Sequence, residues 1–107
     1  MQNKTPKNEK GQAHGLWERY YSNGNLEYKG LYVNGKRHGL FERYWENGNL
    51  LYKGSYLKGQ AHGLWENYFE SGNLRWKGSF INDNQIGLWI WGNNDGSNRE
   101  IRFYANE

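Results

Sequence analysis

The sequence predicts an all-β protein, an elongated single-layer antiparallel β-meander built from tandem 24-residue hairpin repeats. Three observations predict it: a repeat without gaps, two turn signals in each unit, and aromatic-rich runs of six to eight residues between the turns. The repeats occupy residues 11–34, 35–58 and 59–82. A degenerate fourth repeat and C-terminal cap fill residues 83–107, and no segment has a helical pattern.

The composition indicates one folded domain. Aromatic residues make up 18% of the 107 residues, whereas disordered chains are poor in aromatics. The absence of cysteine excludes a disulfide framework and a thiolate metal site. No run of about 18 apolar residues is present, and the N-terminus lacks the apolar stretch of a signal peptide, so we expect a cytoplasmic protein.

Most of the net charge of +3 comes from the first ten residues, where Lys4, Lys7 and Lys10 outnumber Glu9. We therefore expect residues 1–10 to be a flexible basic N-terminal tail, with the repeat domain spanning residues 11–107. Such a tail would give the first edge of the sheet little protection.

Each unit contains two turn signals. The first class comprises Asn23-Gly24, Asn47-Gly48 and Ser71-Gly72, and the second comprises Asn34-Gly35 and Lys58-Gly59. Asn-Gly between strand-like runs is typical of a two-residue type I′ turn, whose central residues both need positive φ. Each repeat is therefore expected to be a hairpin, and the chain a meander of about eight strands.

A two-residue turn at Asn23-Gly24 predicts the pairing of the first hairpin. It places Tyr21 opposite Leu26, Glu18 opposite Lys29 and Trp17 opposite Gly30, and the next two repeats follow the same register. A ring over a cross-strand glycine and an opposite-charge pair both stabilise a sheet. A three-residue loop, which would exchange the two faces, stays open as an alternative.

On this register one face of the sheet is strongly aromatic. The stripe is longer than local packing needs, so we expect it to fold into a groove or to be covered by a partner. This aromatic face carries Trp17, Tyr21, Tyr28, Tyr32, Phe41, Trp45, Tyr52, Tyr56, Trp65, Phe69, Trp76 and Phe80. The other face carries the Glu–Lys pairs together with Leu16, Tyr20, Leu40, Tyr44, Leu64 and Tyr68.

The last residues are expected to close the sheet. A turn at Asp95-Gly96 lets residues 100–104 add a final strand. Ile101 then lies opposite Ile90, and Phe103 lies opposite Leu88. Removing this strand is expected to lower solubility, because an open sheet edge invites pairing with other chains.

The motif G-L-W-E-x-Y-x-x-N-G-N-L-x-Y-K-G-x-Y, with its recurring His-Gly, resembles MORN repeats of the bacterial variant type over residues 11–92. It is similar to the YwqK-like antitoxin family. The resemblance implies an elongated antiparallel sheet and a non-enzymatic role in interactions.

The polar residues offer no catalytic or metal site. His14, His38 and His62 recur once per repeat, and equivalent residues two strands apart lie about 9–10 Å apart, too far to share one zinc ion. Each candidate carboxylate recurs with its own lysine. We therefore predict no catalytic residues, no metal site, no cofactor and no enzymatic activity.

Arginines between rings raise the alternative of a nucleic-acid stacking platform. Cation–π contacts of Arg19 with Tyr28 and of Arg43 with Tyr52 explain the same pattern. The near-neutral charge of residues 11–107 argues against a nucleic-acid partner, and the lack of an amphipathic helix argues against a membrane.

The excess of tryptophan and tyrosine predicts a module that binds another protein. The family resemblance implies an antitoxin, an immunity protein or a phage-type inhibitor. The partner would then be a toxin or a defence or effector protein. Alternatives are a nucleic acid, a lipid or small ligand in an aromatic groove, a structural spacer, and self-association through sheet edges. Trp45 and Trp76 are the predicted hot spots, and Trp17 and Trp65 are predicted to be structural. The predicted partner-binding residues are Tyr21, Tyr28, Tyr32, Trp45, Tyr52, Tyr56, Phe69 and Trp76.

Overall fold

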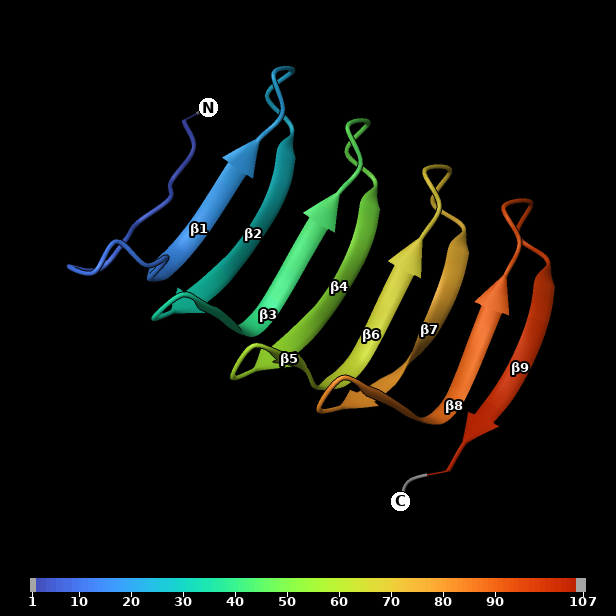
Figure 1. The fold of residues 1–107 in the computed structure, drawn as a ribbon. Coiled ribbons are helices and arrows are strands. Elements are labelled where there is room, and N and C mark those ends of the chain that lie inside the picture. The colour runs from blue at the N-terminus through green and yellow to red at the C-terminus, as the bar shows by residue number, and fades with distance from the viewer. Residues whose placement is uncertain (1, 106–107) are drawn as a thin grey trace.

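The computed structural model describes residues 2–105, which form one open antiparallel sheet. Its strands follow one another as a meander, and the molecule measures 45 × 38 × 12 Å, the thickness of a single layer (Figure 1). The predicted fold class is therefore confirmed, and the sheet is not folded over itself. The strands are β1 (Gly15–Tyr20), β2 (Leu26–Val33), β3 (Lys36–Tyr44), β4 (Leu50–Leu57), β5 (Gln60–Ala61), β6 (Gly63–Tyr68), β7 (Leu74–Ile81), β8 (Asn84–Gly92) and β9 (Asn98–Tyr104).

The expected eight strands become nine because one of them is interrupted. β5 and β6 together correspond to β3 of the preceding repeat, and His62 separates them. Both residues of β5 pair with β4, as Gln60 lies opposite Leu57 and Ala61 opposite Tyr56. The order of the strands is otherwise the predicted one.

The turns of the first class are not the type I′ turns that the sequence predicts. Gly24 N–H donates to the Tyr21 carbonyl, and Tyr21 N–H donates to the Asn25 carbonyl, so the loop has three residues. Gly24 has a φ of 92°, whereas Asn23 does not have positive φ. Tyr20, not Tyr21, therefore lies opposite Leu26.

The three-residue loop does not exchange the faces, because a bulge at Glu27 compensates for it. The register shifts between Arg19 and Tyr20, and beyond this point Glu18 lies opposite Lys29 and Trp17 opposite Gly30. The same shift recurs in the hairpins β3–β4 and β6–β7. The predicted register of the strand interiors is therefore confirmed, although the predicted turn is wrong.

The turns of the second class are two-residue turns with positive φ at both central residues, as predicted. The φ values are 48° and 85° at Asn34-Gly35, and 52° and 85° at Lys58-Gly59. A third turn of this class, at Asn82-Asp83, was not expected from the sequence, since it lacks glycine, yet φ is 48° and 68°. The two classes lie at opposite ends of the strands (Figure 1).

Three rings form the centre of the sheet, because each lies over a glycine. Phe41, Trp65 and Trp89 are 3%, 6% and 2% exposed. A Cβ atom at Gly54 would overlap the Trp65 ring, and Gly30 and Gly78 have the same relation to Phe41 and Trp89. The covered glycine belongs to the preceding repeat, not to the same hairpin as the sequence predicts, since each ring leans back across the boundary between repeats.

The first edge of the sheet is covered, contrary to expectation. Lys4 exchanges two backbone hydrogen bonds with Glu18, and the Pro6 carbonyl accepts from the Trp17 indole at 2.8 Å (Figure 1). Lys4 Nζ also lies 3.5 Å from Glu18. The start of the chain thus lies along β1 and takes the place of a preceding strand.

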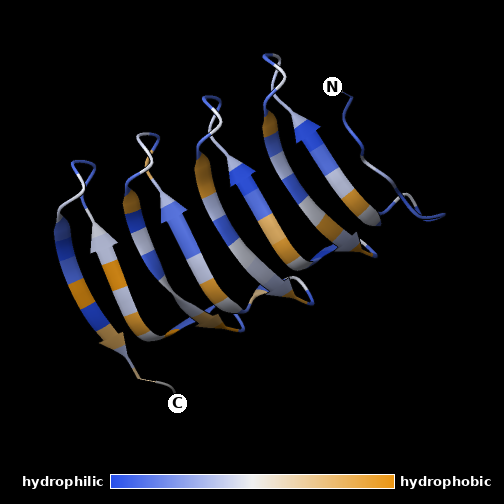
Figure 2. Ribbon diagram, turned by 180° about the vertical axis from the view of Figure 1, so that it is seen from behind, coloured by the Kyte–Doolittle hydropathy of each residue, from blue (hydrophilic) through white to orange (hydrophobic). Residues whose placement is uncertain are grey.

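At the other end the prediction holds: Ile101 lies opposite Ile90, and Phe103 opposite Leu88, in the pair β8–β9. Polar and apolar residues alternate along the strands (Figure 2). The described residues form one sheet only, so they have no thick core between two layers. The described part of the chain, residues 2–105, contains no helical segment that could span a lipid bilayer.

Candidate binding surface

Rings on the aromatic face form one continuous row across the sheet. Successive centroids are 5.0–6.1 Å apart, and most of these contacts are edge-to-face. The three buried rings alternate in this row with half-buried ones. The row runs through Trp17, Tyr32, Phe41, Tyr56, Trp65, Phe80, Trp89 and Tyr104.

A second set of rings stacks on the buried ones. Tyr28 lies 5.6 Å from Phe41, Tyr52 lies 5.6 Å from Trp65, and Trp76 lies 5.1 Å from Trp89, all at small interplanar angles. These outer rings are only half-buried. Five predicted binding residues, namely Tyr28, Tyr32, Tyr52, Tyr56 and Trp76, therefore lie together on one surface.

The other three predicted residues lie where strands enter the first class of turns. Tyr21 donates its hydroxyl to the Tyr44 carbonyl at 2.6 Å, and Trp45 donates its indole N–H to the Tyr68 carbonyl at 3.1 Å. These two residues tie one repeat to the next. Phe69 makes a different contact, because the Arg75 guanidinium lies 5.7 Å from its ring centroid.

A hollow of about 300 Å³ opens near the last turn of the aromatic face. Trp76 and Trp91 come from neighbouring strands and lie opposite each other. Phe69 and two arginines complete the lining, together with Gly92. Indole and phenyl rings next to guanidinium groups accommodate an apolar side chain and a carboxylate at the same time.

The two arginines of this hollow, Arg75 and Arg99, both occupy the bulge position of their hairpin, where the first repeat has Glu27. Neither forms an ion pair within residues 2–105. By contrast, Arg43 lies 3.5 Å from Glu27. The hollow therefore combines half-buried rings with two guanidinium groups that form no ion pair among the described residues.

Two residues of the hollow, Trp91 and Arg99, are not among those predicted from the sequence. Trp91 stands where the first three repeats have Arg19, Arg43 and Asn67, so an alignment of the fourth unit with the other three identifies it. The hollow depends on this change, since a second indole faces Trp76 only in the last repeat.

The chain matches the family described as MORN repeat variant over residues 13–34, 37–58 and 61–82, which together make up more than half of its length. It belongs to the MORN repeat variant family. MORN repeat proteins are generally non-catalytic binding modules, and this chain is a repeat-based binding module. A comparison with curated proteins gives no match.

Two tyrosines of the aromatic face, Tyr28 and Tyr56, hold their hydroxyl protons more tightly than a free tyrosine does. Burial raises the pKa of the Tyr28 and Tyr56 hydroxyls above the ordinary value of 10.0. Arg37, which donates to the Tyr56 hydroxyl at 2.6 Å, opposes this shift but does not reverse it. The aromatic face therefore presents neutral phenols next to guanidinium groups.

The cation–π contacts differ from those predicted. Within residues 2–105 they join Arg37 to Phe41 and Tyr56, and Arg75 to Phe69. The predicted contacts of Arg19 with Tyr28 and of Arg43 with Tyr52 are wrong, although each arginine does lie opposite its tyrosine. Arg43 instead turns to the bulged Glu27.

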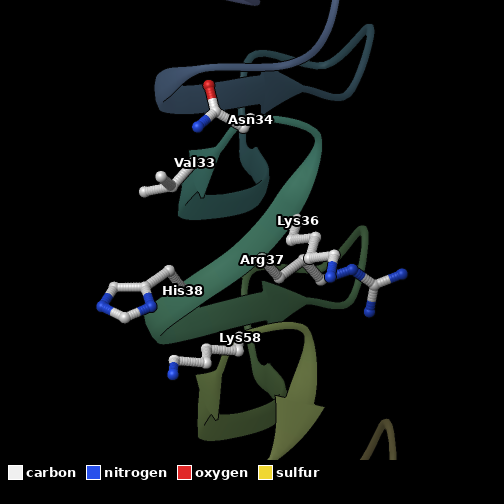
Figure 3. Close-up of a pocket in the computed structure, with 6 residues that line it drawn as sticks. All are labelled: Val33, Asn34, Lys36, Arg37, His38 and Lys58. Carbon is white, nitrogen blue, oxygen red and sulfur yellow. The ribbon is translucent and has the colours of Figure 1, made fainter.

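A larger hollow, of about 450 Å³, lies between the second-class turns of two MORN repeats. Its basic residues do not converge: Figure 3 shows the Arg37 guanidinium pointing away from His38 and Lys58. Arg37 lies opposite Tyr32 and stacks on the ring of Tyr56, whereas His38 lies opposite Leu31 on the other face. This arrangement does not form an anion site.

The recurring histidines lie beside the second-class turns. His14 Nδ1 accepts from the Asn34 backbone N–H at 3.0 Å and so holds the turn of its own repeat. Within residues 2–105, no three residues of the kind that bind metals come together.

The face opposite the rings is also apolar. The leucine of each Gly-Leu-aromatic motif is about half exposed there, and we call this surface the leucine face. Its central residues are Leu16, Leu40, Leu64 and Leu88, with exposures of 48–55%. In the first three repeats Glu–Lys pairs lie beside these leucines, and Lys77 is 3.9 Å from Glu66.

Proposed function

We propose that this protein binds another protein through its aromatic face, with the hollow between Trp76 and Trp91 as the centre of the interface. The observation that carries the proposal is the composition of this hollow. It joins three rings to Arg75 and Arg99, and tryptophan and arginine are enriched among residues that dominate binding energy. The matching partner surface presents an aromatic or aliphatic side chain beside a carboxylate.

The aromatic face is favoured over the leucine face for two reasons. Its rings are contiguous, whereas charged pairs interrupt the leucines in the first three repeats. Rigid aromatic side chains also lose little conformational entropy on binding. The outer rings Tyr28, Tyr52 and Trp76 offer a row of such anchors, one in each repeat.

The biological setting that we propose is that of an antitoxin, an immunity protein or a phage-type inhibitor, which sequesters a toxin or effector in the cytoplasm. This part rests on the likeness of the repeat motif to the YwqK-like family and on the binding character of MORN repeats. A single-layer sheet that measures 45 × 38 Å across is suited to covering the active surface of another protein.

Affinity purification from the native host, followed by titration of the captured protein with purified variants, tests the proposal. Trp76→Ala is expected to weaken binding by about 2 kcal/mol or more, which is roughly thirty-fold in Kd. Arg75→Glu is expected to act in the same direction by repelling the partner carboxylate. Leu64→Ala, an exposed change on the leucine face, is the matched control and should bind normally.

Trp45 stays in the predicted binding set, but its indole also bonds to Tyr68, so Trp76 gives the cleaner test. If Leu64→Ala weakened binding and Trp76→Ala did not, the interface would lie on the leucine face. If nuclease treatment removed everything captured, the partner would be a nucleic acid. Co-expression with the captured protein then tests the antitoxin setting, since relief of its growth defect should require Trp76.

A further inference from the structure

We propose that two copies of this chain pair through their β9 strands, antiparallel and centred on Ile101, to form one continuous sheet. The occupant of the last sheet edge is thus a second copy of the same strand. The inference concerns an edge and not the hollow, so it stands independently of the proposed function.

The first observation is that the two edges of the sheet differ in accessibility. Residues 3–7 cover β1, and Pro6 in this segment has no N–H to offer to another strand. β9 pairs with β8 on one side, and nothing within residues 2–105 pairs with its other side. Its outward N–H and C=O groups are therefore available to a further strand.

The second observation is that the sequence of β9 complements itself. β9 has seven residues, from Asn98 to Tyr104, with Ile101 at the midpoint. Antiparallel self-pairing about this midpoint places Glu100 opposite Arg102 of the second copy, and the two-fold axis generates the same contact again. Opposite charges directly across a strand pair are stabilising. In the single chain these two side chains already form an exposed ion pair at 2.6 Å.

The third observation is an apolar patch that only the last repeat has. Where the third repeat pairs Glu66 with Lys77, the fourth pairs Ile90 with Ile101. Phe103 likewise lies opposite Leu88. Ile101 and Phe103 are 63% and 74% exposed, the highest values among the large apolar residues that the structure describes.

Self-pairing makes these patches continuous. Residues directly opposite each other in a strand pair project from the same face, so Ile101 meets its own copy at the axis, and Phe103 lies diagonal to Ile101 of the second copy. The two leucine faces then share one surface, and so do the two aromatic faces. A dimer of this kind therefore presents two copies of the aromatic hollow on the same side.

A foreign strand is the competing occupant, and the charges argue against it. A foreign strand needs no relation to the order Glu-Ile-Arg, whereas self-pairing uses both charges twice. Because the paired segment is one short strand, the expected affinity is that of a small, reversible interface.

Sedimentation equilibrium of the full chain and of two charge-reversed variants tests the pairing. The parent chain should dimerise reversibly as its concentration rises. Glu100→Arg places arginine opposite Arg102, and Arg102→Glu places glutamate opposite Glu100, so each variant alone should dimerise about tenfold more weakly or worse. An equimolar mixture of the two should recover the association, because every cross-strand pair is then opposite in charge.

Recovery of dimerisation in the mixture distinguishes pairing between chains from a role of the Glu100–Arg102 ion pair within one chain. Mixing the two variants cannot restore an ion pair within either chain. The proposal is overturned if the parent chain stays monomeric, if the single variants dimerise like the parent, or if the mixture stays monomeric. Circular dichroism on each variant confirms that exposed charge reversal leaves the sheet folded.

A cysteine pair provides a second readout, since the natural chain has no cysteine. Ile101→Cys places two thiols at the axis, where Cβ atoms of opposite residues lie about 4.5–5.5 Å apart, and mild oxidation should yield a covalent dimer. Leu16→Cys is the matched control, on the same face but in the covered edge strand. Equal cross-linking of both variants, or none of either, would contradict the proposal.

Discussion

The two edges of the sheet differ. At the first edge, residues 3–7, which lie outside the repeats, form hydrogen bonds as a neighbouring strand would. At the last edge, β9 has no pairing partner on its outer side among the residues described. Lys4 pairs with Glu18 as Lys53 pairs with Glu66 in the interior. The Pro6 carbonyl accepts from Trp17 as the Ser55 carbonyl accepts from Trp65. Thr5 lies between Lys4 and Pro6, at the position that Gly54 occupies in the interior strand.

The last edge lacks the feature that lets a further repeat dock. Arg102 occupies the position that Gly54 and Gly78 hold in the interior, so another buried ring would have no glycine to lie on. The boundaries between repeats therefore depend on a ring that reaches back to the repeat before it. The first ring therefore needs a substitute strand, and the last strand needs a different neighbour.

The largest expected effect is on the free energy of unfolding. The strand at the last edge should contribute more to it than the segment that covers the first edge. A chain that ends at Asn98 loses most of β9 and uncovers Trp89, which is 2% exposed. Thermal and urea unfolding should show a loss of at least ~3–5 kcal/mol, the scale for a buried aromatic residue, together with poor solubility. Deleting residues 2–7 uncovers only the half-buried Trp17 and should cost less. If the first deletion left a soluble monomer with an unchanged Tm, β9 would not stabilise the sheet.

The next prediction compares an interior ring with the first one. Trp65→Ala removes a ring that fills the space over Gly54 and should destabilise the fold by ~3–5 kcal/mol in urea unfolding. Trp17→Ala should cost clearly less, because Trp17 is half-buried and rests on residues outside the repeats. Equal losses would mean that the N-terminal segment supports its ring as well as a true strand does.

The repeat made most of this fold predictable. The 24-residue period, the Asn34-Gly35 turn and the pairing of Glu18 with Lys29 all follow from local sequence, and the structure has them. The first class of turns was mistaken because Asn-Gly suits both a type I′ turn and the end of a three-residue loop. The compensating bulge at Glu27 has no sequence signature of its own.

Two further features could not be derived from one repeat. The direction in which each ring leans depends on packing between repeats, which the spacing within a hairpin does not encode. The covering of β1 by Lys4 and Pro6 could not be predicted from the repeat pattern. The segment matches the repeat at Lys4 but has Thr5 where the interior strand has Gly54. For the candidate site, the outer rings were predictable, but Trp91 lies in the most degenerate unit.

A smaller effect is expected in the turns, where asparagines link each repeat to the next. Asn47 and Asn49 both donate side-chain N–H groups to the Glu70 carbonyl. Asn47→Ala removes one of these bonds and one bond within the turn, so it should lower stability by about 1 kcal/mol. Asp95, in the last turn, bonds only to Ser97 among the residues described, and Asp95→Ala should cost less. Equal losses in urea unfolding would show that the bonds between turns contribute nothing.

The smallest effect is expected at alkaline pH. Burial raises the pKa of five tyrosine hydroxyls above 10.0, and all five lie in the first three repeats: Tyr21, Tyr28, Tyr44, Tyr56 and Tyr68. Since the folded state holds these protons more tightly than the unfolded state, their contribution is fully present below pH ~10 and is lost as pH rises through the raised pKa.

Urea unfolding at increasing pH measures this loss of stability. The matched variant is Tyr56→Phe, because it removes the ionisable hydroxyl but keeps the ring against Phe41 and Trp65. Its stability should fall less steeply above pH ~10 than that of the parent chain. The loss should also begin in the first three repeats. In a chain whose other tryptophans are replaced by phenylalanine, Trp91 fluorescence should therefore change at a higher pH than the circular dichroism of the whole sheet. A steeper fall of stability in Tyr56→Phe would contradict the raised pKa of this hydroxyl. A fluorescence change at lower pH than the dichroism change would contradict the assignment of the raised pKa values to the first three repeats.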